Sequence, residues 1–167
     1  MKLIIVRHAK SSWNQPEVGD HHRPLAARGR KAATRIGQWL ADDGHIPASV
    51  LCSTATRTRQ TWECLSSHFP NTPKIRLTDQ LYHASVRQIW AVLQNDGSVD
   101  LPTLIIGHNP GIGEFAASCL QAPPRDYDFR RYPTAATTVC TFPATGWQQV
   151  SMQSGQLMAF VVPRKLA

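Results

Sequence analysis

The sequence predicts an α/β protein built as a three-layer sandwich, with a mostly parallel central sheet, helices on both of its faces and an antiparallel C-terminal edge. Two observations carry this prediction. Short apolar runs alternate with segments whose apolar residues recur at helical spacing, a rhythm typical of a parallel sheet covered by helices. After Pro133 the chain changes to short β-type runs joined by Gly-containing turns, which is typical of antiparallel strands.

The predicted strands are short runs of apolar or β-branched residues that are bounded by residues unfavourable to strands. The four parallel strands are predicted at Lys2–Val6, Ser49–Cys52, Lys74–Leu77 and Thr103–Ile106. The antiparallel strands are predicted at Thr137–Phe142, Trp147–Met152 and Leu157–Val162. We expect the antiparallel strands to complete one edge of the same sheet.

Helices are predicted between the parallel strands, where apolar residues recur every three to four positions. They span Gly29–Leu40, Thr58–Phe69, Val86–Leu93 and a segment that follows Pro110 and runs to Pro123. Ser85 is suited to cap the N-terminus of the third helix, and Pro70 ends the second. The irregular stretch 125–132 is predicted to be a surface loop.

The length and composition predict a single domain over residues 1–167, because no linker, repeat or low-complexity segment divides the chain. No apolar run approaches the ~20 residues that cross a bilayer. Only the run Leu3–Val6 precedes Arg7, which is too short for a signal peptide. The four cysteines lie far apart, as reduced structural thiols do. We therefore expect a soluble, cytoplasmic protein that does not act at a membrane.

The formal net charge of +7 predicts an acidic ligand such as phosphate, a phosphoprotein or nucleic acid. The basic residues are spread along the chain without a dense block, so nucleic acid is not the expected partner. His21 and His22 are adjacent and belong to no metal-binding spacing such as H-E-x-x-H, so no metal site is predicted.

Polar side chains follow three of the predicted parallel strands. Arg7 and His8 follow the first strand, Arg57 begins the helix after the second, and His108 follows the fourth. In an open α/β sheet, ligands bind beyond the carboxyl ends of the strands. Guanidinium groups bind phosphate oxygens, and a neutral imidazole can attack phosphorus. Any one of these residues alone would be typical of an ordinary loop, but their convergence predicts a site for phosphoryl chemistry.

Three sequence blocks resemble the signatures of the histidine phosphatase superfamily. They are "VRHAKSSWN", "LCSTATRTRQT" and "LIIGHNPGI", in this order. The fuller run "RHAKSSW…DHHRPLAARGRKAA" and the later "YPTAAT" are similar to the short branch of SixA-like phosphohistidine phosphatases. The resemblance spans nearly the whole chain. It implies a phosphoglycerate mutase-like fold and hydrolysis through a phosphohistidine without a cofactor, on a phosphorylated protein or a small phosphate ester.

The resemblance also implies roles for residues at matching positions. His8 would be the nucleophile, Arg7 and Arg57 would bind the phosphoryl oxygens, and His108 would complete the catalytic pocket. Asn14 stands where the superfamily often has a phosphate-contacting Asn, although a loop-capping Asn is an equal alternative.

The proton donor for the leaving group is less well defined by the sequence. Asp79 best matches the general acid that follows the third strand in many members of the superfamily, whereas a turn-capping Asp is the structural alternative. His83, His108 and water stay open as other donors.

Two further functions also stay open at this point. The same pocket could serve a small-metabolite phosphomonoesterase or, from a different class, a non-catalytic module that binds phosphate or a phosphopeptide. The presence of all four pocket residues argues against the binding module. The chain lacks the large insertions with which phytase-like and mutase members build a cap, which implies an open site suited to a phosphorylated protein side chain.

Overall fold

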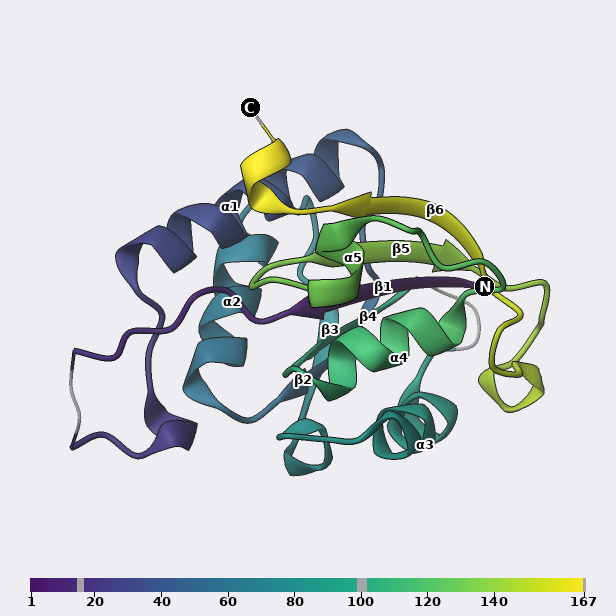
Figure 1. The fold of residues 1–167 in the computed structure, drawn as a ribbon, viewed down its shortest axis with the longest axis horizontal. Helices are drawn as coiled ribbons and strands as arrows, with labels where there is room; N and C mark the ends of the chain where they lie inside the picture. Colours follow the sequence, from purple (N-terminus) through teal and green to yellow (C-terminus); the bar gives the residue numbers. More distant parts are fainter. Residues whose placement is uncertain (15–16, 99–101, 167) are drawn as a thin grey trace.

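The computed structural model describes residues 1–14, 17–98 and 102–166, and its six-stranded sheet has the order β3-β2-β4-β1-β5-β6 (Figure 1). The strands are β1 (Lys2–Arg7), β2 (Ser49–Ser53), β3 (Lys74–Thr78), β4 (Thr103–Gly107), β5 (Thr137–Thr141) and β6 (Gln156–Val161). The first four strands pair in parallel, while β5 runs antiparallel to both β1 and β6. The predicted α/β sandwich with an antiparallel C-terminal edge is confirmed.

The longer helices cover both faces of this sheet (Figure 1). The helices are α1 (Ala27–Asp42), α2 (Thr56–Ser66), α3 (Val86–Asp96), α4 (Gly111–Cys119) and the short α5 (Tyr127–Arg131). α1 and α2 pack together on one face, and α3 and α4 pack together on the other. Ser85 caps α3 in a capping box with Gln88, as its position predicted. None of the described helices combines the length and apolarity that a membrane crossing requires.

Side chains of β1 alternate between two apolar clusters, one under each helical layer. Ile4 packs in the cluster that includes Ile36 of α1, whereas Ile5 packs in the cluster that includes Phe115 of α4. All four side chains are fully buried. A parallel strand covered on both faces is apolar without interruption, which explains the run Leu3–Val6. The four cysteines are free thiols.

The predicted strand Trp147–Met152 is wrong. The chain forms a 3-10 turn there, η3 (Trp147–Gln149), which packs against α3. Trp147 is fully buried, and its indole N–H donates to the carbonyl of Ser98 at 2.7 Å. The burial and hydrogen bond of Trp147 therefore fix the conformation of this segment, although its apolar residues alternate as they would in a strand.

The predicted surface loop 125–132 is also corrected, because it contains α5. The Asp126 side chain caps this helix by accepting a hydrogen bond from the Asp128 N–H at 2.6 Å. Phe129 and Tyr132 are buried in the cluster under α4. Asp128 is buried as well and pairs with Arg164 of η4 (Pro163–Lys165). Dense surface charge hid this short element in the sequence.

Candidate active site

The site lies where β1, β4 and β2 end side by side. Arg7 of β1 is opposite Gly107 of β4, so His8 and His108, the next residues of the two strands, are neighbours with ring centroids 5.1 Å apart. β2 pairs with the other edge of β4 and leads into α2, whose second residue is Arg57. The structure thus brings together the four residues that the sequence predicts to form one pocket.

His8 is held in one tautomer by its neighbours. Its Nδ1–H donates to the Ala9 carbonyl at 2.7 Å, because a carbonyl oxygen can only accept. The other ring nitrogen, Nε2, accepts from Nε–H of Arg57 at 3.4 Å. Nε2 is therefore the unprotonated ring nitrogen, and its lone pair accepts this long hydrogen bond at the wall of the pocket that His8 lines.

His108 has the opposite tautomer for the same reason. Its Nδ1 accepts a hydrogen bond from Nη2 of Arg57 at 3.1 Å, since a guanidinium can only donate. Its Nε2–H consequently donates to Oγ of Ser53 at 2.8 Å. Arg57 thus determines the protonated nitrogen of both histidines.

Both imidazoles are neutral in the folded protein at neutral pH. Burial, followed by the charges of Arg57 and Arg7, lowers the pKa of His8 to about 3, although the hydrogen bond to Ala9 acts in the opposite direction. Burial, followed by the proximity of His8 and Arg57, lowers the pKa of His108 to about 2. Neutral imidazole is the nucleophilic form, so His8 needs no base to activate it.

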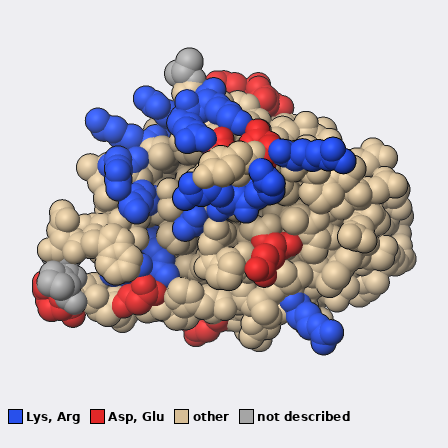
Figure 2. Space-filling view, in the orientation of Figure 1, with Lys and Arg blue, Asp and Glu red and all other residues tan. Residues whose placement is uncertain are grey.

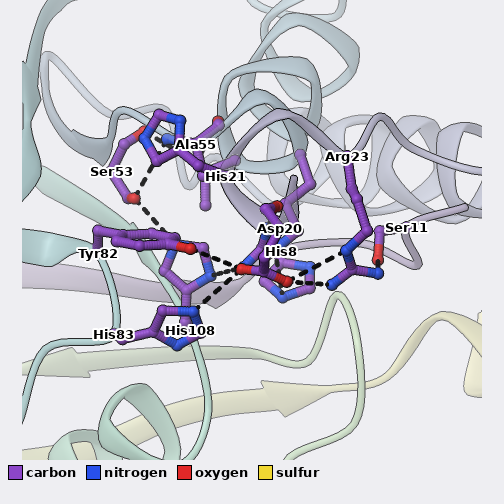
Figure 3. A network of polar contacts seen from close by, with 12 residues as sticks. His8, Ser11, Asp20, His21, Arg23, Ser53, Ala55, Tyr82, His83 and His108 are labelled. Atoms are coloured by element: carbon purple, nitrogen blue, oxygen red, sulfur yellow. Dashed lines mark hydrogen bonds and ion pairs between the residues drawn. The ribbon is translucent and has the colours of Figure 1, made fainter. Parts of the chain in front are cut away.

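Arg57 is almost fully buried, and Asp20 balances its charge. Nη2 of Arg57 lies 3.0 Å from Oδ2 of Asp20, and Nη1 donates to the Asp20 main-chain carbonyl at 2.6 Å. Asp20 belongs to the 3-10 turn η1 (Asp20–His22) and is also bound by Arg23, Tyr82 and His83 (Figure 3). Burial raises the pKa of the Asp20 carboxyl, but the hydrogen bonds from Tyr82, Arg23 and His83 outweigh it and keep Asp20 ionised.

Arg7 is fixed by the segment that follows α5. Its Nη1 donates to the carbonyl of Tyr132 at 2.8 Å, and the same carbonyl accepts from the side-chain amide of Asn109 at 3.1 Å. Nε of Arg7 is buried and has no hydrogen-bond partner among the described residues. The bond from Nη1 thus orients the guanidinium of Arg7, and its Nε–H remains as a buried donor for an anion.

Asn14 and Asp79 do not line this pocket in the part of the chain that the structure describes. Asn14 is exposed, and its backbone N–H donates to Oγ of Ser12 at 3.2 Å. Asp79 is exposed at the start of η2 (Asp79–Leu81) and accepts from the Thr54 hydroxyl. Thr54 also contacts Nε2 of His21 at 2.9 Å. The side chain that caps η2 is that of Thr78, which accepts from the Gln80 N–H.

The carboxylate and the exposed imidazole at the pocket are Asp20 and His83. The pocket encloses about 180 Å³, and Trp13, Arg23 and Asn109 also line it. Nε2 of His83 lies 3.1 Å from Oδ2 of Asp20, and the His83 ring centroid is 5.2 Å from that of His108. The backbone of His83 has φ of 49°, a left-handed conformation that non-glycine residues adopt rarely.

Asp20 and Arg23 were not among the site residues expected from the sequence. The guanidinium of Arg23 stacks 3.6 Å from the ring centroid of Trp13 and also donates to Oγ of Ser11 at 3.0 Å. The signal for both lay in the run "DHHRPL", an acid and an arginine three residues apart. Only the position of η1 over the strand ends brings that pair to the pocket.

Known proteins are similar to this chain in sequence and in fold. The sequence profile of the histidine phosphatase superfamily (branch 1) matches residues 3–83, and the chain is 31% identical to a protein of Nakamurella multipartitia described as the phosphohistidine phosphatase SixA. That match covers 97% of this chain and 95% of the other, with a TM-score of 0.80. The chain belongs to the histidine phosphatase superfamily, in its SixA-like branch. It is a histidine phosphatase by family.

Two further proteins are similar to this chain. An uncharacterized protein of Mycobacterium leprae (strain TN) is 31% identical over 166 residues, which cover 95% of this chain and all of the relative. A SixA protein histidine phosphatase solved with tungstate is 22% identical, with a TM-score of 0.78 over 100% of both chains. The second match supports the fold of this histidine phosphatase.

Proposed function

We propose that this protein is a phosphatase that works through a phosphohistidine formed on His8, and that its substrate is a phosphorylated protein, with phosphohistidine as the preferred group. The domain spans residues 1–167 and acts in the cytoplasm, where its free cysteines stay reduced. The observation that carries the proposal is the unprotonated Nε2 of His8, which lies beside Arg57 in the pocket that both residues line.

In the first step, Nε2 of His8 attacks phosphorus in line with the bond to the leaving group, which breaks as the new P–N bond forms. The guanidinium groups of Arg7, Arg23 and Arg57 line the pocket and balance the charge of the phosphoryl oxygens. Neutral His108 lies beside His8 and completes the pocket. In the second step, water attacks the phosphoryl group, the P–N bond breaks, and phosphate leaves with His8 again neutral.

His83 is the proposed proton donor for the leaving group. Asp79 is bonded to Thr54 and does not line the pocket, whereas His83 lines it and is oriented by Asp20. Asp20 itself stays ionised and has no proton to give. The imidazole of His83 can donate a proton to the leaving group in the first step and accept one from water in the second.

The substrate class rests on the size and openness of the pocket. A volume of about 180 Å³ accommodates a phosphoryl group and little more, so the rest of the substrate must lie outside. The related proteins support this choice, since one is described as a phosphohistidine phosphatase and another was solved with tungstate, an oxyanion.

Covalent trapping tests the proposal. We expect the wild-type protein, mixed with a ³²P-labelled phosphohistidine protein and quenched in base, to carry a label that is stable to base and labile to acid. The His8→Ala variant should carry none, and the matched control His22→Ala, which changes an exposed histidine outside the pocket, should label as the wild type does. Lack of label on wild type, or its retention in His8→Ala, contradicts the proposal.

The rates of hydrolysis test the substrate class. We expect kcat/KM to be highest for a phosphohistidine protein, lower for a phosphoserine peptide and lowest for a sugar phosphate. A sugar phosphate hydrolysed faster than the phosphohistidine protein would instead favour a small-metabolite phosphomonoesterase.

A further inference from the structure

A second cavity adjoins the catalytic pocket. It encloses about 380 Å³ and is the larger of the two. Lys10 and Thr134 line both cavities, so the two share a wall. The other lining residues are Arg28, Ala32, Pro133, Val162, Pro163 and Arg164. The second cavity therefore begins where a substrate bound in the catalytic pocket would emerge.

All the charged residues that line the second cavity are basic: Lys10, Arg28 and Arg164. Arg164 is paired with Asp128, whereas Lys10 and Arg28 form no ion pair with any residue in 1–14, 17–98 and 102–166. Figure 2 shows Lys and Arg side chains gathered on this face, over α1, α5 and the C-terminal end. Cations held close together without an acidic partner favour an anion between them.

The backbone holds Lys10 and Arg28 next to each other. The carbonyl of Lys10 accepts from the backbone N–H of Ala26 at 2.9 Å, at the start of α1. A Cβ at Gly29 would lie 2.1 Å from that carbonyl oxygen, so glycine is required for this approach of α1 to the active-site loop. The neighbourhood of the two cations is thus a property of the fold.

We propose that this cavity binds a second anionic group of the substrate, namely an acidic side chain that flanks the phosphorylated residue of a protein. The inference rests on the proposed function and sharpens it from phosphoproteins in general to those with an acidic segment at the phosphorylation site. The catalytic pocket takes the phosphoryl group, and the guanidinium of Arg28 and the ammonium of Lys10 take the neighbouring carboxylate. The exposed mouth of the cavity allows a polypeptide to pass over both sites.

A pair of phosphohistidine peptides tests this inference. One carries Asp and Glu next to the phosphohistidine, and the other carries Asn and Gln at the same positions. We expect wild-type kcat/KM to favour the acidic peptide by roughly tenfold in dilute buffer, as two partly exposed charge pairs would provide. The preference should decrease at high salt, because salt screens exposed charges.

The variant Arg28→Gln is expected to reduce this preference roughly fivefold, and Lys10→Gln with Arg28→Gln to abolish it. The matched control is Arg35→Gln, which removes the same charge from an exposed position of α1 that lines neither cavity. The control should keep the full preference. Equal kcat/KM values for the two peptides in wild type, or the same loss of preference in Arg35→Gln, overturn the inference.

The same variants distinguish a protein carboxylate from an anionic group of a small molecule. If Arg28→Gln alters the preference for a sugar bisphosphate over its monophosphate, and leaves the peptide preference unchanged, the assignment to a protein segment is wrong. Failure of the proposed function has a different signature, because neither peptide would then be hydrolysed and His8 would carry no label.

Discussion

The floor of the catalytic pocket and its rim differ in burial. The buried floor suits a nucleophile, and the exposed rim suits a proton donor. The floor consists of His8, Arg57 and His108, with exposures of 8%, 2% and 2%. The rim consists of Asp20 and His83, with Tyr82 beside them as a hydrogen-bond donor to Asp20, and the side chains of Asp20 and His83 are 43% and 53% exposed. A nucleophile needs a fixed protonation state, which burial provides, whereas a proton donor must exchange with water.

The two regions also come from different kinds of backbone. Floor residues lie at the ends of β1 and β4 and in the first turn of α2, where neighbouring strands fix their positions. Rim residues lie in or beside the turns η1 and η2, and they are linked mainly through the Asp20 carboxylate. Replacing a floor residue should therefore abolish most of the hydrolytic activity, whereas replacing a rim residue should change the activity only in part.

The largest expected difference is in protonation. Because the pKa of His8 is about 3 and that of His108 about 2, histidine NMR signals of the floor should not titrate between pH 8 and pH 4, whereas free imidazole titrates near 6.5. Below pH ~6.5 the histidines of the unfolded chain bind protons that His8 and His108 of the folded protein do not bind. The free energy of unfolding should therefore decrease as the pH is lowered. A urea midpoint that rises on acidification from pH 7 to pH 4, or a floor signal with a pKa near 6.5, would contradict the buried floor.

The next largest effect is expected for Arg57→Gln. This change removes the donors to His8 and His108 and the ion pair with Asp20, so kcat/KM should fall roughly 10³-fold. Steady-state hydrolysis of 4-nitrophenyl phosphate measures the loss, with circular dichroism to confirm folding. The control Arg59→Gln alters an exposed arginine of the same helix and should change kcat/KM by about twofold at most. A folded Arg57→Gln enzyme within tenfold of wild type would refute the role of Arg57.

A smaller and more selective loss is expected at the rim for His83→Gln. Proton donation matters most when the leaving group is a poor one, so phenyl phosphate hydrolysis should slow by about 10²-fold. The loss on 4-nitrophenyl phosphate should be much smaller. The measurement is the slope of log kcat/KM against the pKa of the leaving phenol, which His83→Gln should steepen and the control Asp79→Asn should leave unchanged. If Asp79→Asn steepens the slope instead, Asp79 is the proton donor.

The smallest expected effect is on stability and comes from Asp20→Asn. Loss of the carboxylate leaves the buried charge of Arg57 without its ion-pair partner, yet Asp20 is partly exposed and water can replace part of the interaction. We therefore expect the free energy of unfolding in urea to fall by about 1–2 kcal/mol. Asp79→Asn should change it by less than about 0.5 kcal/mol, since Asp79 lies at the surface. Equal losses in the two variants would remove the distinction between these carboxylates.

The sequence alone predicted the floor of the pocket and the position of Arg7 next to it. Parallel strands in a βα repeat end at the same edge of a sheet, so residues that follow the strands must meet there. This rule placed Arg7, His8, Arg57 and His108 together before any distance was known. The apolar strands and the four longer helices were predicted for a related reason, since periodicity reflects local geometry and burial.

The tertiary structure decided the rim, the second cavity and the segment after Pro123. Asp79 follows β3 as expected, but the hydroxyl of Thr54 holds it away from the pocket, and η1 brings Asp20 in. Tyr132 belongs to the stretch 125–132, which the sequence predicts to be a loop, and its main-chain carbonyl orients Arg7. These outcomes depend on how turns distant in sequence pack over the strand ends, and no local periodicity encodes that packing. What the sequence determined is the set of groups at the strand ends, because topology fixes them; which groups close over them was decided only by the fold.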